Sequence, residues 1–135
     1  MEANKVDYAR EVGVAEEDVV FAWSGEMSRG GGNVSSYTPD HVVTLLHSHK
    51  LITLTILGTQ VFPSPQALDI LMDLMADTRP YLGGRAHSGM AYGADNIVKV
   101  AGPVLGDAAT QHPDYQVLIL GYSLGAGLAQ LVTLD

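Results

Sequence analysis

Cysteine is absent from this 135-residue sequence, and charged residues make up only 16% of it. Without cysteine there are no disulfides, thiolate metal sites or cysteine nucleophiles. Only seven Lys and Arg stand against fifteen Asp and Glu, and the net charge of −8 excludes the clustered basic surface that nucleic-acid binding needs. No apolar leader is visible near the N-terminus, so we expect no secretory signal there and a cytoplasmic or membrane-associated location.

Hydrophobic residues make up 47% of the sequence, a share typical of a folded chain with a buried core. We find no internal repeat and no domain boundary, so residues 1–135 are interpreted as one domain. Residues 28–36 are rich in Gly and Ser and are expected to form a surface loop. Because no Gly-Lys-Ser/Thr follows the glycines, this loop does not resemble a phosphate-binding loop.

Hydrophobic periodicity predicts an alternation of helices and strands along the chain. The expected elements are a helix over 5–15 broken by Gly13, a hairpin of strands 41–46 and 51–57, a helix over 66–76, a turn over 81–85, a helix over 87–105 that ends or resumes at Pro103, a strand over 115–120 and a helix over 126–134. This order favours an α/β fold with a mostly parallel sheet. The unbroken apolar run at 117–120 is typical of a strand covered on both faces.

The most informative motif is the Gly-x-Ser-x-Gly pattern from Gly121 to Gly125, which follows an apolar strand and precedes a helix. In that setting Ser123 occupies a sharp turn that exposes its hydroxyl, and small Gly121 and Gly125 let strand and helix approach. The helix N-terminus directs its amides toward the serine, and we expect the Leu124 N–H to be an oxyanion donor. The sequence therefore predicts a nucleophilic Ser123.

Three other interpretations of the sequence were weighed. Residues 117–134 carry no charge, and Gly121 and Gly125 have the spacing of packed membrane helices, but the polar residues within the run argue against a membrane span. His47 and His49 have a spacing usable for metal, yet they lack a third ligand. Asp69, Asp73 and Asp77 are better explained as a solvated helix face. We therefore predict no metal site.

Residues 115–129 resemble the nucleophile region of the class 3 lipases, the fungal-lipase-like family with an α/β-hydrolase fold. Upstream, residues 51–59 look like the family's strand ending in Arg-Gly-Thr/Ser, and residues 86–90 look like its His-x-Gly-Phe/Met segment. Residues 69–74 are more loosely similar to its Asp-rich helix. The opening residues 9–20 are closest in character to the sn-1-specific diacylglycerol lipase branch.

The resemblance implies that Ser123 is the nucleophile and that Thr59, after Gly58, is the second oxyanion donor. It also implies that the substrates are acylglycerols or other lipid esters, with transient contact at a lipid interface, and that no cofactor is required. Two positions depart from the family pattern: Leu57 stands where the family has Arg, and Tyr122 replaces a His. The first departure removes a charge that would brace the oxyanion loop.

A serine needs a histidine base and a carboxylate that orients it, and in this fold the chain order is serine, acid, histidine. No histidine follows Ser123 in the sequence. We therefore expect this chain to be the N-terminal portion of a lipase domain, truncated after the nucleophile helix and inactive alone. The alternatives are a non-catalytic pseudo-lipase fragment with a binding or regulatory role, and a membrane-inserted tail segment. The oligomeric state is open.

Overall fold

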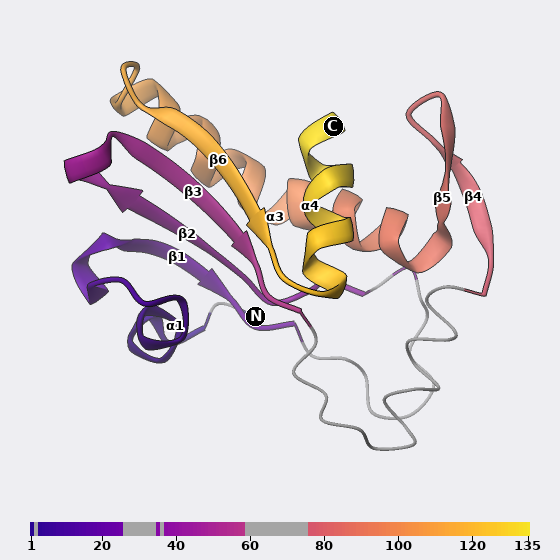
Figure 1. Ribbon diagram of the computed structural model, residues 1–135, viewed down its shortest axis with the longest axis horizontal. Coiled ribbons are helices and arrows are strands. Elements are labelled where there is room, and N and C mark those ends of the chain that lie inside the picture. The colour runs from indigo at the N-terminus through magenta and orange to yellow at the C-terminus, as the bar shows by residue number, and fades with distance from the viewer. Residues whose placement is uncertain (2, 26–34, 36, 59–75) are drawn as a thin grey trace.

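The computed structural model describes residues 1, 3–25, 35, 37–58 and 76–135 of the chain. In chain order the elements are α1 (Lys5–Val12), η1 (Glu16–Asp18), β1 (Val19–Trp23), β2 (His41–Leu46), η3 (His47–His49), β3 (Leu51–Ile56), β4 (Thr78–Tyr81), β5 (Gly84–His87), α3 (Ser88–Gln111), β6 (Gln116–Gly121) and α4 (Leu124–Leu134). Figure 1 shows one twisted sheet with helices on both sides and a separate β4–β5 hairpin.

The main sheet has four strands in the order β1-β2-β3-β6. β1 with β2 and β2 with β3 are antiparallel, whereas β3 with β6 is parallel, from Leu51 opposite Gln116 to Ile56 opposite Gly121. The expectation of an α/β fold is confirmed. The prediction of a mostly parallel sheet is wrong for the described strands, which form a mixed sheet. The physical reason is the three-residue η3 turn, which is long enough only to reverse the chain between β2 and β3.

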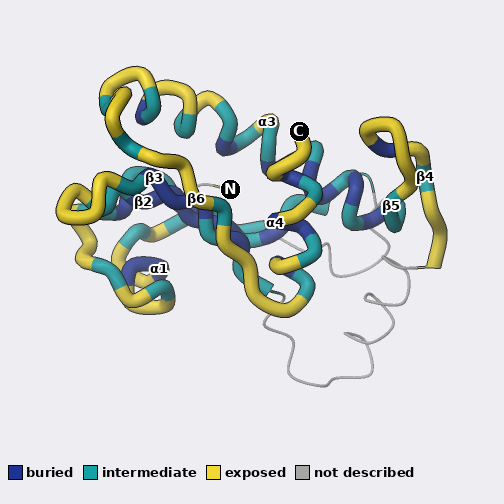
Figure 2. The backbone as a smooth tube through the Cα atoms, turned by 45° about the horizontal axis from the view of Figure 1, so that its top comes forward, coloured by how far each residue is buried: buried dark blue, intermediate teal, exposed yellow. Residues whose placement is uncertain are grey.

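The two faces of the sheet are covered by different helices, because successive residues of a strand point to opposite sides. Ile52, Leu54 and Ile56 are fully buried in one cluster with residues of α3 and α4. Val42, next to Val43 of that cluster, packs instead with Tyr8 and Ala9 of α1. The central strands therefore form the buried middle layer of the molecule (Figure 2).

Most of the expected elements are present, with two differences at helices and turns. α3 continues through Pro103, so the predicted interruption there is wrong. Pro103 is exposed, and the helix is anchored on either side by buried Ala101 and Ala108, so water can bond the carbonyl that loses its partner. The predicted turn at 81–85 is the tip of the β4–β5 hairpin, whose Leu82 and Gly83 both have positive φ, of 42° and 84°.

β6 differs from the buried strand that its apolar run predicts. Val117 is 48% exposed, Leu118 41% and Leu120 42%, because β6 pairs only with β3 among the described residues. Apolar continuity predicted the strand correctly, with bounds shifted by one residue, but its burial on both faces is wrong. Of the described strands, β6 therefore forms one edge of the sheet.

Two predicted segments lie outside the described residues. They are the Gly/Ser-rich loop 28–36, apart from Ser35, and the helix over 66–76, apart from Ala76. Residues 117–134 form strand, turn and helix, so their interpretation as a membrane span is wrong. No helix in the described ranges combines the length and the apolar character that a bilayer crossing needs.

Removal of a central side chain should weaken the fold far more than removal of a peripheral one. Leu54→Ala leaves a cavity between β3 and the helices, and we expect it to lower the free energy of unfolding by about 2–5 kcal/mol. Leu134→Ala, at a leucine that is 69% exposed, should change it by less than about 0.5 kcal/mol. Urea denaturation of both variants measures the difference, and equal losses would contradict the core as described.

Candidate active site

Ser123 lies in the turn between β6 and α4, with its side chain exposed to solvent. Its backbone has φ 56° and ψ −124°, a conformation that residues other than glycine rarely adopt and that costs about 1–3 kcal/mol. The turn is held by the Gly125 N–H, which donates to the Tyr122 carbonyl at 2.9 Å, and by the Ala126 N–H, which donates to the Ser123 carbonyl at 3.0 Å. The strained turn predicted from the sequence is therefore present.

The glycines on either side of Ser123 are required by close packing. A Cβ on Gly121 would collide with the backbone carbonyl of Gly125. A Cβ on Gly125 would collide with the carbonyl of Ile56 and lie 3.2 Å from the Gly58 nitrogen. β6 and α4 can approach each other this closely only because Gly121 has no side chain. α4 can approach the end of β3 only because Gly125 has none.

The end of β3 reaches the Ser123 turn through Gly58. A Cβ on Gly58 would lie 2.7 Å from the Tyr122 carbonyl oxygen and 3.2 Å from the Ser123 Cβ. The parallel pairing of Ile56 with Gly121 produces this contact, as expected when two parallel strands end at one edge of a sheet. Thr59, the predicted second oxyanion donor, lies outside the described residues, directly after Gly58.

Leu124 is the first residue of α4, directly after Ser123. The first amides of a helix have no carbonyl partner within it, and the helix dipole adds positive potential at the same end. The Gly125 and Ala126 amides are bonded to the Tyr122 and Ser123 carbonyls, so the Leu124 N–H is the amide next to which an anion forming at the Ser123 side chain would lie. The arrangement can stabilise a tetrahedral oxyanion without a metal, and within the described residues no group of three or more potential ligands is placed to hold a metal ion.

Asp40 stabilises the end of β3 next to Gly58, a role that the sequence did not predict. Its carboxylate accepts the Tyr8 hydroxyl at 2.7 Å and the Gly25 N–H at 2.8 Å, and its carbonyl accepts the Leu57 N–H at 2.9 Å. These bonds join α1, the residues after β1 and the end of β3, next to Gly58. Leu57 stands where the family has Arg. Its side chain is partly buried against the hydrophobic cluster that contains Tyr8 and Ala9, so this position contributes apolar packing and no charge.

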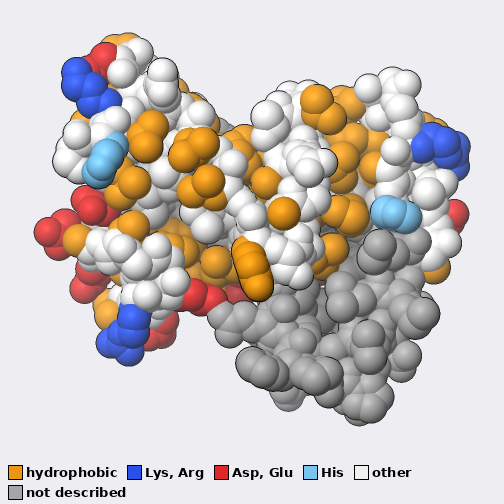
Figure 3. Space-filling view, viewed as in Figure 1, with side chains coloured by type: hydrophobic (Ala, Val, Ile, Leu, Met, Phe, Trp, Pro, Cys, Tyr) orange, Lys and Arg blue, Asp and Glu red, His pale blue; other side chains and the backbone are white. Residues whose placement is uncertain are grey.

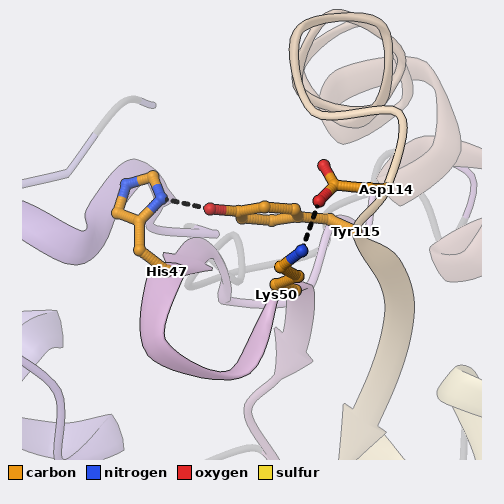
Figure 4. Close-up of polar contacts among 4 residues, drawn as sticks. All are labelled: His47, Lys50, Asp114 and Tyr115. Atoms are coloured by element: carbon orange, nitrogen blue, oxygen red, sulfur yellow. Dashed lines mark hydrogen bonds and ion pairs between the residues drawn. The ribbon is translucent and has the colours of Figure 1, made fainter.

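The histidines do not partner Ser123 in the described part of the chain. His47 and His112 lie at the other end of the sheet, where His47 Nδ1 and the Tyr115 hydroxyl are 2.7 Å apart and Lys50 pairs with Asp114 (Figure 4). That end is five strand residues from Gly121, about 16 Å away. His49 is bonded to Ser48 in the same exposed η3 turn. His87 precedes α3, and its buried Nδ1 has no hydrogen-bond partner among the residues that the structure describes.

His41 is the histidine on the same row of the sheet as Gly121, two strands away, or about 10 Å. It is fully buried beside the rings of Phe21 and Trp23, and its Nδ1 lies 2.7 Å from the Pro39 carbonyl. Burial lowers the pKa of its ring below the usual 6.5. At that distance the buried His41 ring does not reach the Ser123 hydroxyl.

Comparison with known proteins identifies the family to which this site belongs. A model of the family described as lipase (class 3) matches residues 53–135, which include both β3 and the Ser123 turn. The chain belongs to the class 3 lipase family. Lipases of Rhizopus niveus and Rhizopus oryzae are each 33% identical to this class 3 lipase chain over 86 residues, covering 64% of it and 21% of the relative. The chain thus spans about a fifth of the length of these curated relatives.

Solved lipases share the fold of this class 3 lipase chain. Lipase II from Rhizopus niveus matches with a TM-score of 0.69 and 23% identity, covering 98% of this chain and 45% of that one. Rhizomucor miehei triacylglyceride lipase matches with a TM-score of 0.65 and 21% identity, over 87% and 40%. These neighbours have the α/β-hydrolase fold, which confirms the expected fold class. Neither of them is described as a diacylglycerol lipase, so that branch stays a prediction.

Backbone strain at Ser123 predicts that glycine there stabilises the chain. Ser123→Gly relieves about 1–3 kcal/mol of strain and costs about 0.5–1 kcal/mol in entropy of the unfolded state, so the net gain should be about 1 kcal/mol. Ser123→Ala retains the Cβ and should not stabilise. Thermal denaturation of the two variants measures the difference, and a Ser123→Gly variant no more stable than Ser123→Ala would contradict the strained turn.

The raised pKa of the Tyr8 hydroxyl predicts that the folded chain loses stability at alkaline pH. Burial, together with its bond to Asp40, raises the pKa of Tyr8 from 10.0 to about 12. The unfolded chain therefore releases this proton first, so the contribution is fully present below pH 10 and is lost as the pH rises through about 12. Urea midpoints at about pH 9 and about pH 11.5 should differ less in Tyr8→Phe than in the wild type, and an identical pH dependence would contradict this assignment.

Proposed function

We propose that this class 3 lipase chain carries the nucleophile and oxyanion half of a serine ester hydrolase. The observation that supports the proposal most is the exposed, strained Ser123 at the start of α4, in contact with Gly58. In the proposed reaction Ser123 Oγ attacks the ester carbonyl carbon. The tetrahedral oxyanion accepts a hydrogen bond from the Leu124 N–H. Thr59, the residue that follows Gly58 in the sequence, supplies the second hydrogen-bond donor.

Collapse of that intermediate breaks the bond to the alcohol and leaves an acyl group on Ser123, which water then removes. The proton of the Ser123 hydroxyl has to pass to a base and then to the leaving alcohol. None of the chain's described histidines hydrogen-bonds to Ser123. We infer that turnover by this chain alone is lower than that of a complete triad by a factor of about 10⁶.

For the substrate we propose carboxylic esters of acylglycerols, with contact at a lipid interface. The family membership supports an ester hydrolase of the lipase type, and the structural neighbour from Rhizomucor miehei is described as a triacylglyceride lipase. Acyl transfer through a serine requires no cofactor. The second candidate is a pseudo-lipase that binds lipid esters without turning them over. The observation in its favour is that, in the described part of the chain, the hydrogen bonds of His41, His47 and His49 go to residues other than Ser123.

Chemical rescue separates these two functions. We expect free imidazole, which can accept the serine proton, to accelerate labelling of the wild-type chain by a fluorophosphonate in proportion to its concentration. Mass spectrometry should place the phosphonyl group on Ser123, and Ser123→Ala should remove the accelerated phase. Ser48→Ala, at a serine in the distant η3 turn, is the matched control and should label like the wild type.

Two outcomes would contradict the proposed hydrolase. One is labelling that imidazole does not accelerate, and the other is a label that persists in Ser123→Ala. If labelling succeeds, hydrolysis of tributyrin and of 4-nitrophenyl acetate in imidazole tests the substrate class. A chain that cleaves only the soluble ester would contradict the acylglycerol assignment while leaving the nucleophile in place.

A further inference from the structure

Asp40 connects other segments of the chain to the Ser123 end of the sheet. The Leu57 N–H donates to the Asp40 carbonyl, and this bond continues the pairing of β2 with β3 one residue beyond the last pair of the ladder. Gly58 follows Leu57 directly, and a Cβ on Gly58 would lie 3.2 Å from the Ser123 Cβ. Asp40 is therefore joined to the Ser123 turn through a hydrogen bond, a peptide link and a close packing contact.

The carboxylate of Asp40 is held from two sides. The Tyr8 hydroxyl of α1 donates to one oxygen at 2.7 Å, and the Gly25 N–H, after β1, donates to the other at 2.8 Å. Tyr8 is 9% exposed and packs in the apolar cluster with Val42, so its ring cannot move freely. A Cβ on Gly25 would collide with the Thr38 carbonyl, so the residues after β1 lie close against the segment that leads into Asp40. These contacts fix the Asp40 backbone relative to α1 and β1.

Charge pairing does not explain this carboxylate. The ion pairs within the described residues are made by Lys50 and Arg79, and neither includes Asp40. Figure 3 shows acidic side chains gathered around α1 and the start of β1. The pKa of Glu11 in α1 is raised by burial and by the charge of Asp40. Repulsion between like charges offsets part of what the hydrogen bonds contribute, so the carboxylate supplies two directed acceptor atoms rather than an ion pair.

We propose that Asp40 is a positioning residue for the Ser123 site, an inference that rests on the proposed ester hydrolase. Asp40 lies two strands from β6 and acts through the backbone, not on the ester. It holds residues 57–58 against the Ser123 turn, so that the Leu124 N–H keeps the geometry in which it meets a developing oxyanion. Without the carboxylate the Asp40 backbone is free to shift, and the end of β3 shifts with it. Small displacements near a reacting group lower its rate strongly.

The rate of fluorophosphonate labelling in imidazole, measured against probe concentration, separates positioning from folding. Asp40→Ala removes both acceptor oxygens, and we expect the maximal labelling rate of Ser123 to fall about tenfold. The half-saturating probe concentration should stay unchanged, because Asp40 does not contact the probe. Asp40→Asn can accept from the Gly25 N–H and donate to the Tyr8 oxygen, so it should restore most of the maximal rate.

Val19→Ala is the matched control, because Val19 is buried in the same apolar cluster as Tyr8 but lies at the other end of β1. It should lower the free energy of unfolding in urea and leave the labelling rate unchanged. Tyr8→Phe keeps the ring, removes one bond to Asp40 and should lower the maximal rate about threefold, a test that does not depend on the folding of Asp40→Ala. An unchanged rate in Tyr8→Phe would overturn the positioning role. So would equal rates in Asp40→Ala and Val19→Ala, or no recovery in Asp40→Asn.

Amide hydrogen exchange tests the positioning role without the proposed chemistry. If imidazole does not accelerate labelling of the wild type, the hydrolase fails, and exchange rates then decide the role of Asp40. The Leu57 N–H, bonded to Asp40, reports the end of β3, and the Gly125 N–H reports the turn after β6. Relative to Val19→Ala, both should exchange about tenfold faster in Asp40→Ala and about threefold faster in Tyr8→Phe. Gly125 exchange that is the same in all three variants would overturn the inference.

Discussion

The parallel pairing of β3 with β6 is the constraint on which the rest of this structure depends. It sets Ile56 opposite Gly121, so both strands end at one edge and Gly58 meets the Ser123 turn. A slip of one residue would turn every β6 side chain to the other face and move Gly58 away from Ser123. The glycines follow from this contact, since the turn, the helix and the end of β3 approach too closely for a Cβ.

Strain at Ser123 is maintained by the packing around it. α4 begins directly after the serine and is anchored by buried Gly125 and Leu128, while β6 is fixed to β3 by hydrogen bonds. The Asp40 bonds hold the end of β3 from the other side. A free turn would relax to a common conformation, so the cost at Ser123 has to be offset by these neighbouring contacts. This is the arrangement expected where a side chain is held ready for chemistry.

The sequence predicted those parts of the molecule whose signals are local. The β-rich run over residues 51–57 predicted β3, and the Gly-x-Ser-x-Gly pattern predicted the turn at Ser123 and the helix after it. Contacts between distant segments were not predictable: Asp40 is joined to Tyr8 across 32 positions. The exposure of β6 also differed, because an apolar run reports that a strand forms but not which neighbours cover it. Thr59 stays a prediction, since it lies outside the described residues.

The central claim is that a nucleophilic Ser123 stands beside helix amides that can stabilise an oxyanion. A crystal structure of the chain after reaction with a phosphonate ester tests this claim most directly. The account predicts phosphorus bonded to Ser123 Oγ, a positive φ at Ser123, and a phosphonyl oxygen within about 3.1 Å of the Leu124 nitrogen. Phosphorus on another residue, or an adduct whose oxygens point away from α4, would contradict the account.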